Sequence, residues 1–128
     1  MARVTYLRSI ANNTPYTMTL IDGEDPGMSL ALGAQSAWIG SLAVPWIGRD
    51  GEDYKAMRVI LGPRAETNLF LFQDYWQPAG ENAIKCLEAP TMSYTSNQVQ
   101  EVPGSNRGGG SKNLIVSLVG RDFKLYIA

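Results

Sequence analysis

The stretch NLFLFQDYW, residues 68–76, decides the fold class of this chain. Its first half, from Leu69 to Phe72, is apolar at every position, which is typical of a central β-strand packed on both faces. The segment YKAMRVIL (54–61) alternates between apolar and other side chains, and GPRAET (62–67) has the composition of a turn. These segments are therefore predicted to form a β-hairpin.

Alternation with a period of two continues at both ends of the chain. RVTYLRSI (3–10) and TPYTMTLID (14–22) both alternate, and the Asn, Thr and Pro residues around their junction predict a hairpin turn. At the other end, NLIVSLVGRDFKLYIA (113–128) predicts a hairpin that turns at Gly120 and Arg121. Weaker strands are expected at 28–33, 36–42, 83–88, 92–95 and 98–102.

Glycine and proline divide the chain into short segments. There are 13 glycines and 7 prolines, and no window has the period of an amphipathic helix. At 128 residues the chain has the length of a single domain, 1–128. We predict an all-β, single-domain antiparallel β-sandwich of roughly 8–11 short strands, with a β-barrel or β-trefoil-like fold as the alternative.

Composition excludes several classes of function. The formal charge is -1 and the 11 basic residues are scattered, so no nucleic-acid partner is expected. Histidine is absent and Cys86 is the only cysteine, which excludes histidine-based catalysis, imidazole metal sites and an intrachain disulfide. We therefore expect a protein that is not an enzyme and that holds no cofactor and no metal.

Two acidic segments and one glycine-rich segment leave alternatives open. Asp-Gly-Glu-Asp occurs at 22–25 and at 50–53, where the carboxylates would suit calcium, a glycosidase pair or an ordinary solvated turn. VPGSNRGGGSKN (102–113) has the glycines of a phosphate-binding loop but not its order, because Ser111 precedes Lys112. A mobile hairpin loop is the prediction for this segment.

The first residues of the chain give no targeting signal. MARVTYLRSIANN alternates and lacks the apolar stretch of a secretory signal. No segment approaches the ~20 apolar residues that a membrane-spanning helix needs. A cytoplasmic location is the expectation.

The candidate ligand site lies where the central strand turns polar. Tyr75 and Trp76 would offer flat apolar faces with polar edges at the end of that strand. Stacking planes beside hydrogen-bonding groups suit the recognition of a sugar or a lipid headgroup. The alternative is that Trp76 covers the end of the core and Asp74 caps the turn. The predicted ligand-binding residues are Asp74, Tyr75, Trp76, Gln77, Asn82 and, from a second segment, Trp46.

That second segment, SAWIGSLAVPWIG (36–48), contains Trp-Ile-Gly twice and no charge. Gly40 and Pro45 disfavour a helix, and proline has no N–H to donate, so two short strands around a bend are expected. Trp38 is predicted to belong to the core. Trp46, beside Pro45 and before a charged loop, is a candidate rim residue.

An acidic chain with few cysteines, no signal peptide and Trp and Tyr expected at the surface resembles small cytosolic β-sandwich lectins. It also resembles β-sandwich membrane-binding cytolysins, and neither resemblance assigns a role to any residue. We predict a non-enzymatic lectin-like module that binds a carbohydrate or glycoconjugate. The alternative is a lipid-headgroup-binding, pore-forming protein of toxin or defence type, with WIGSLAVPWIG at the membrane interface. A long edge strand, either around Pro45 or at the carboxyl terminus, could also pair subunits in a homo-oligomer.

Overall fold

The structure, a computed structural model, describes residues 4–77 and 81–128. Within these residues it contains eleven strands and one short 3-10 helix, η1 (Asp50–Lys55). The strands are β1 (Thr5–Asn13), β2 (Met18–Asp22), β3 (Asp25–Leu32), β4 (Ser36–Ala43), β5 (Trp46–Ile47), β6 (Met57–Leu61), β7 (Thr67–Asp74), β8 (Ile84–Glu88), β9 (Gln100–Glu101), β10 (Gly110–Val119) and β11 (Asp122–Ile127).

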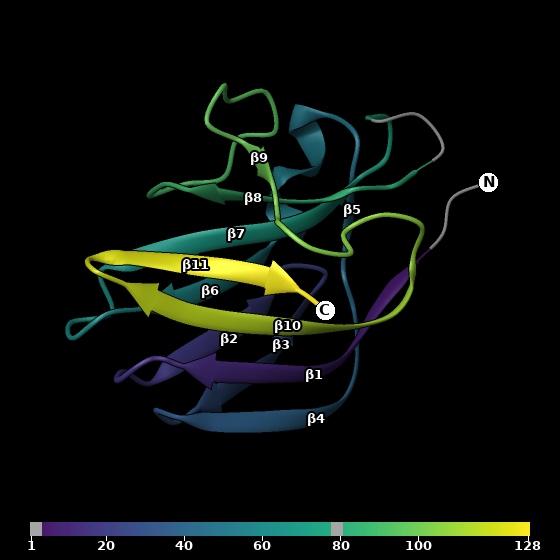
Figure 1. The fold of residues 1–128 in the computed structure, drawn as a ribbon. Coiled ribbons are helices and arrows are strands. Elements are labelled where there is room, and N and C mark those ends of the chain that lie inside the picture. The colour runs from purple at the N-terminus through teal and green to yellow at the C-terminus, as the bar shows by residue number, and fades with distance from the viewer. Residues whose placement is uncertain (1–3, 78–80) are drawn as a thin grey trace.

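The strands form two sheets stacked face to face, which confirms the predicted β-sandwich (Figure 1). The four-stranded sheet has the order β11-β10-β1-β4. The seven-stranded sheet has the order β3-β2-β6-β7-β8-β9, and β5 pairs with β7. The described strands do not close into a barrel. Most neighbours are antiparallel as predicted, but β1 pairs with β10 and β5 with β7 in parallel.

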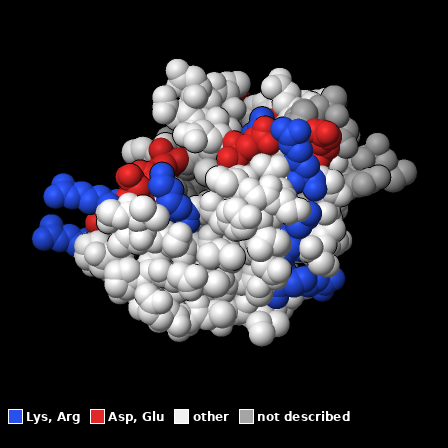
Figure 2. Space-filling model, in the orientation of Figure 1, with Lys and Arg blue, Asp and Glu red and all other residues white. Residues whose placement is uncertain are grey.

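Alternation places the core between the two sheets. Side chains such as Leu7, Leu20, Leu71 and Leu114 have no exposed surface, and each contributes about 1.5–3 kcal/mol by burial. The outer face of the four-stranded sheet is mostly polar or small. Figure 2 shows that the lower part of this view, over β1 and β4, carries no charge apart from basic side chains at its right margin.

Strand β7 is buried on both faces, as its unbroken apolar run predicts. Leu69 and Leu71 join the core between the sheets. Phe70 and Phe72 join a second cluster on the opposite face of the same sheet. That face is covered by residues of the 89–99 connection, which include Met92, Tyr94 and Val99.

This covering role corrects two of the weaker strand predictions. Residues 92–95 form no strand, and the strand expected over 98–102 is reduced to the two residues of β9. The backbone of the connection turns between β8 and β9, with Ser96 N–H donating to the Ser93 carbonyl (3.2 Å). Its apolar side chains point onto Phe70 and Phe72 rather than alternating along a strand.

The first predicted hairpin is wrong, because β1 and β2 lie in different sheets. Instead, β2 pairs with β3 and β6, while β1 pairs with β4 and β10. The chain crosses between the sheets here, and Asn12 and Thr14 bond to the backbone and to each other at the crossing. The buried Asn12 amide nitrogen lies within hydrogen-bond distance of the Tyr16 and Leu32 carbonyls (2.8 and 3.1 Å), and the Thr14 hydroxyl donates to Asn12 Oδ1 (2.7 Å).

The glycine-rich segment is also not a hairpin loop, because it leads from β9 in one sheet to β10 in the other. Gly104 pairs with Ile127 of β11, and any Cβ at Gly104 would collide with the Ile127 carbonyl. Arg107 forms ion pairs with Glu81 (2.7 Å) and Glu101 (3.0 Å). These contacts fasten the segment to both sheets.

Candidate functional site

Pairing of β5 with β7 brings Trp46 to the end of the central strand. Trp46 lies opposite Gln73, and the Tyr75 N–H donates to the Ile47 carbonyl (3.1 Å). Ile47 is fully buried and anchors this short strand. The bend expected at Pro45 is confirmed, because β4 and β5 on its two sides belong to different sheets.

Three aromatic side chains, Trp46, Tyr75 and Trp76, form what we call the aromatic platform. The rings of Trp46 and Tyr75 are 5.9 Å apart and those of Tyr75 and Trp76 4.6 Å apart, each pair at 79°. Such edge-to-face pairs are worth about 0.5–1.5 kcal/mol beyond burial, so they hold the rings in a defined orientation. Tyr75 nevertheless remains 45% exposed and Trp76 59% exposed.

A hollow of about 350 Å³ lies against the platform and is also lined by Gly48, Arg49 and Glu52. A Cβ at Gly48 would stand 2.7 Å from the Trp76 Nε1 atom, so only glycine lets the indole lie where it does. The Glu52 carboxylate accepts the Gly48 N–H (2.9 Å) and an ion pair from Lys55 (2.8 Å). The Lys55 ammonium and the Gly48 N–H lower the pKa of Glu52, which keeps a negative charge at the hollow.

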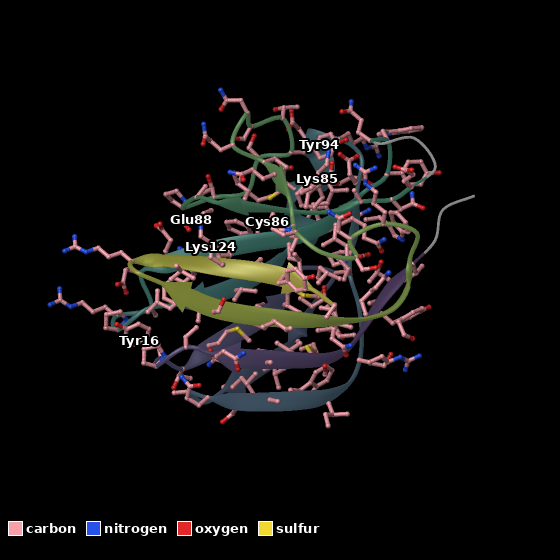
Figure 3. The ribbon with its side chains drawn as sticks, in the orientation of Figure 1. Tyr16, Lys85, Cys86, Glu88, Tyr94 and Lys124 are labelled. Carbon is pink, nitrogen blue, oxygen red and sulfur yellow. The ribbon has the colours of Figure 1, made fainter. Side chains whose placement is uncertain are left out.

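Asp74 lies beneath the platform and organises it. Its Oδ1 accepts the N–H groups of Trp76 (2.9 Å) and Gln77 (3.1 Å). The Tyr94 hydroxyl donates to the same oxygen (2.7 Å), and Lys85 contacts Oδ2 (2.8 Å); Figure 3 labels Tyr94 and Lys85 at the top of the molecule. Burial by itself raises the pKa of Asp74, but the hydrogen bonds from Lys85 and Tyr94 outweigh it and hold the pKa below its usual value.

The structure thus brings three of the six predicted site residues, Trp46, Tyr75 and Trp76, to one surface. Asp74 is 3% exposed, so it supports the turn from below. Gln77 follows on the exposed side of that turn. Asn82 is 2% exposed and outside the lining of the hollow, and its carbonyl accepts the Gln73 side-chain N–H (3.2 Å). Residues 78–80 of the predicted Gln-Pro-Ala-Gly turn lie outside the described residues.

Sequence reasoning missed Gly48, Arg49 and Glu52. Their closeness in sequence to Trp46 could have indicated them, since all three follow it within six positions. The second Asp-Gly-Glu-Asp copy, expected as a loop, forms the helix η1 that carries Glu52.

Neither acidic copy assembles a metal site in the described part of the chain, where no three Asp, Glu, His or Cys side chains gather to hold an ion. The carboxylates bind nearby protein groups instead. Asp53 accepts the Tyr94 N–H (3.0 Å), Asp50 the Thr95 hydroxyl (3.2 Å), and Asp22 the Glu24 N–H (3.0 Å).

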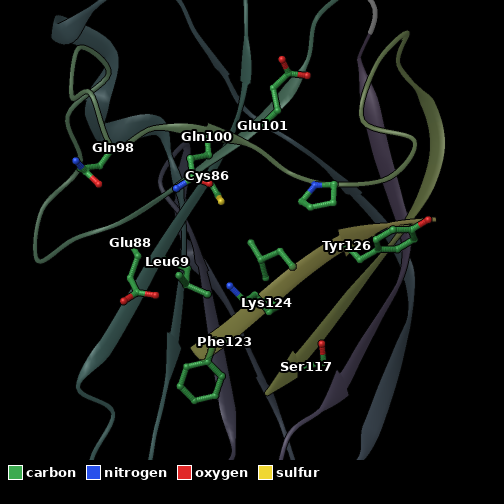
Figure 4. Close-up of a pocket in the computed structure, with 12 residues that line it drawn as sticks. Leu69, Cys86, Glu88, Gln98, Gln100, Glu101, Ser117, Phe123, Lys124 and Tyr126 are labelled. Atoms are coloured by element: carbon green, nitrogen blue, oxygen red, sulfur yellow. The ribbon is translucent and has the colours of Figure 1, made fainter. Parts of the chain in front are cut away.

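A second, larger hollow of about 760 Å³ opens between the sheets, and sequence reasoning did not anticipate it. Figure 4 shows Leu69 and Cys86 of the seven-stranded sheet facing Phe123 and Lys124 of β11 across this groove. Burial, with a smaller effect of Glu88, raises the pKa of the Cys86 thiol to about 11. At neutral pH the thiol is therefore protonated and unreactive, and it only lines the groove.

Comparison with known proteins provides no relative to guide the assignment, because no protein-family model, no curated protein and no solved structure matches the chain. Across the described residues, no helix is long and apolar enough to cross a membrane.

Proposed function

We propose that this protein is a lectin-like binding module, and that the aromatic platform stacks against a sugar ring of a carbohydrate or glycoconjugate without catalysing a reaction. The observation that carries the proposal is the pair Tyr75 and Trp76. Both rings are exposed, yet turn hydrogen bonds and ring contacts hold them in place. Preorganised aromatic faces lose little conformational entropy when a ligand binds.

The polar lining supports the same ligand class. A sugar ring has apolar C–H faces and a rim of hydroxyl groups that donate and accept hydrogen bonds. Glu52 is an acceptor with a lowered pKa, and Arg49 is an exposed donor beside the rings. At about 350 Å³ the hollow is near the lower end of the usual range for small-molecule sites, which favours a short terminal glycan unit.

The lipid-binding alternative has less support. It requires residues 38–48 to form one apolar surface, but Val44 is 1% exposed, Ile47 is fully buried, and Trp38 packs against the core. The charged Glu52 at the hollow also opposes insertion into an apolar phase. Glycan recognition is therefore the function we favour.

The test is a glycan-panel screen followed by titration of tryptophan fluorescence with the best-binding glycan. We expect Trp76→Ala to weaken binding at least about tenfold, which corresponds to about 1.4 kcal/mol. Tyr126→Ala is the matched control, because Tyr126 is 49% exposed but lines the other groove.

No glycan binding, or loss of binding only in Tyr126→Ala, would contradict the proposal. Co-sedimentation with anionic liposomes that is lost in Trp46→Ala would favour the lipid alternative.

A second prediction concerns the glycine under the indole. Gly48→Ala should displace Trp76 and weaken glycan binding about as much as Trp76→Ala, because the new methyl group overlaps the Trp76 ring. Gly51→Ala, three residues away with no atom within 4 Å of its Cβ position, should leave binding unchanged. Equal glycan affinities of Gly48→Ala and Gly51→Ala would show that the orientation of Trp76 does not matter for binding.

A further inference from the structure

In the described part of the chain the outermost strands of the two sheets are β11, β4, β3 and β9, and all but β4 are protected against pairing with another chain. β9 is only two residues long and carries Glu101, which is paired with Arg107. β3 contains Pro26, which has no N–H to donate, directly after the charged Asp25. Short strands, charges and prolines are the usual devices that prevent edge-to-edge association.

The edge formed by β11 is protected in a different way. Asp122 and Lys124 place charges of both signs along it. Near its end, the Ile127 N–H donates to the Pro103 carbonyl (2.9 Å) and the Ile127 carbonyl accepts the Ser105 N–H (2.8 Å). The chain's own 103–105 segment therefore occupies this end of the edge.

β4 has none of these protections. It is eight residues long, contains no charge and no proline, and among the described strands pairs only with β1. Its register on β1 shifts between Leu7 and Ser9, yet side chains continue to alternate along β4 through that point. Ile39 on its outer face is 84% exposed.

We propose that β4 is a dimerisation edge, and that it pairs antiparallel with β4 of a second copy of this chain to continue the four-stranded sheet into eight strands. A two-fold axis places the strand opposite a copy of itself, so a residue on the axis faces its own counterpart, and residues on either side of it face one another across the axis. β4 carries no charge, and its outer face presents Ile39 between the small residues Ala37 and Ser41, so such a pair opposes no like charges. A second copy is thus the partner that β4 fits best.

Strand geometry restricts the register of this pair. Residues directly opposite each other in an antiparallel pair lie on the same face of the sheet. Because the side chains of β4 alternate, the two opposite residue numbers must both be odd or both be even. The register that sets Ile39 against Ile39 of the second copy meets this condition and buries both side chains against each other. It also sets Ala37 opposite Ser41, two small side chains.

One strand pair with few side-chain contacts makes a small interface, so we expect a dimer that dissociates on dilution in about the micromolar range. This inference does not depend on the glycan proposal. A dimer of this kind would give the protein two aromatic platforms and therefore the capacity for bivalent binding.

Light scattering coupled to size-exclusion chromatography, with sedimentation at several concentrations, tests the edge. The native chain should approach twice its 14.0 kDa mass at high concentration. Ile39→Lys should be monomeric throughout and should melt like the native chain, because the side chain is exposed. Val119→Lys adds the same charge at another exposed position (62%) and should still dimerise. A native chain that is monomeric at every concentration, or variants that behave alike, would overturn the proposal.

Disulfide cross-linking tests the register. In a Cys86→Ser background, Ile39→Cys should form a covalent dimer under mild oxidation, because opposite Cα atoms lie about 4.5–5.5 Å apart, within disulfide range. Ser41→Cys, on the same strand and the same face, should cross-link far more slowly, since it would face Ala37. Faster cross-linking of Ser41→Cys than of Ile39→Cys would refute this register.

Discussion

At the residue scale, Asp74 and Trp76 are close in sequence but have opposite roles at the candidate site. Asp74 is the last residue of β7 and points into a network with Lys85 and Tyr94. Trp76 follows two positions later and points into solvent. The carboxylate therefore orients the turn that displays the indole, and its charge state matters to the whole site.

Replacing this carboxylate should change how stability depends on pH. Because the folded pKa of Asp74 is lowered, its stabilisation is fully present above the ordinary value of 3.8 and is lost as pH falls through the lower folded pKa. Asp74→Asn should cost about 2–3 kcal/mol near neutral pH by urea unfolding, since charge-assisted hydrogen bonds are lost. The difference in unfolding free energy between this variant and the native chain should narrow as the pH falls below 3.8. Asp122→Asn, exposed on β11, is the control and should change little; an equal loss in both variants would exclude this role.

At the element scale, local and long-range pairings differ in how far the sequence predicts them. The hairpins β6–β7 and β10–β11 were predicted correctly, because each joins strands through a short turn of suitable composition. In the second, Val119 pairs with Asp122, and Gly120 between them takes a φ of 65°. Positive φ at the first turn position is what a type II′ hairpin turn requires.

Gly120→Ala should therefore destabilise the protein by about 1–2 kcal/mol in urea unfolding, because an L-residue is strained at this φ. No atom lies within 4 Å of the added methyl group, so backbone strain is the only cause. Gly27→Ala in β3 is the matched control, with an ordinary 3.7 Å contact to the Asp25 side chain, and should stay within about 0.5 kcal/mol. A neutral Gly120→Ala would rule out this turn geometry.

At the scale of the whole molecule, stacking of the sheets creates surroundings that no single element possesses. Cys86 illustrates this, because its thiol lies in the groove between β8 and β11. Burial there raises its pKa from 9.0 to about 11, which lowers the thiolate fraction at neutral pH.

Cys86 should consequently report on the integrity of the sandwich. At about pH 7 an alkylating reagent should react with the native thiol on the order of 100-fold more slowly than with the urea-unfolded chain, where the pKa returns to its usual value. The measurement is the rate of mass increase by iodoacetamide. Similar rates in the native and unfolded chain would mean that the groove does not enclose the thiol.

The sequence by itself determined the all-β class, the doubly buried central strand and the aromatic content of the site. These follow from patterns within a few residues, such as side-chain alternation, turn composition and the apolar run at 69–72. The break at Pro45 is local in the same way, because it follows from the missing N–H of proline.

Only the tertiary structure decided which sheet each strand joins and which residues meet at the site. Alternation in β1 and β2 is equally consistent with a hairpin and with a crossover, and in the structure the two strands lie in different sheets, with the Asn12 amide close to the Tyr16 and Leu32 carbonyls. The platform depends on the parallel pairing of β5 with β7, which joins Trp46 to Tyr75 across 29 positions of sequence. Strand pairing at such separations is governed by the packing of the entire core, and the local periodicity of the sequence does not predict it.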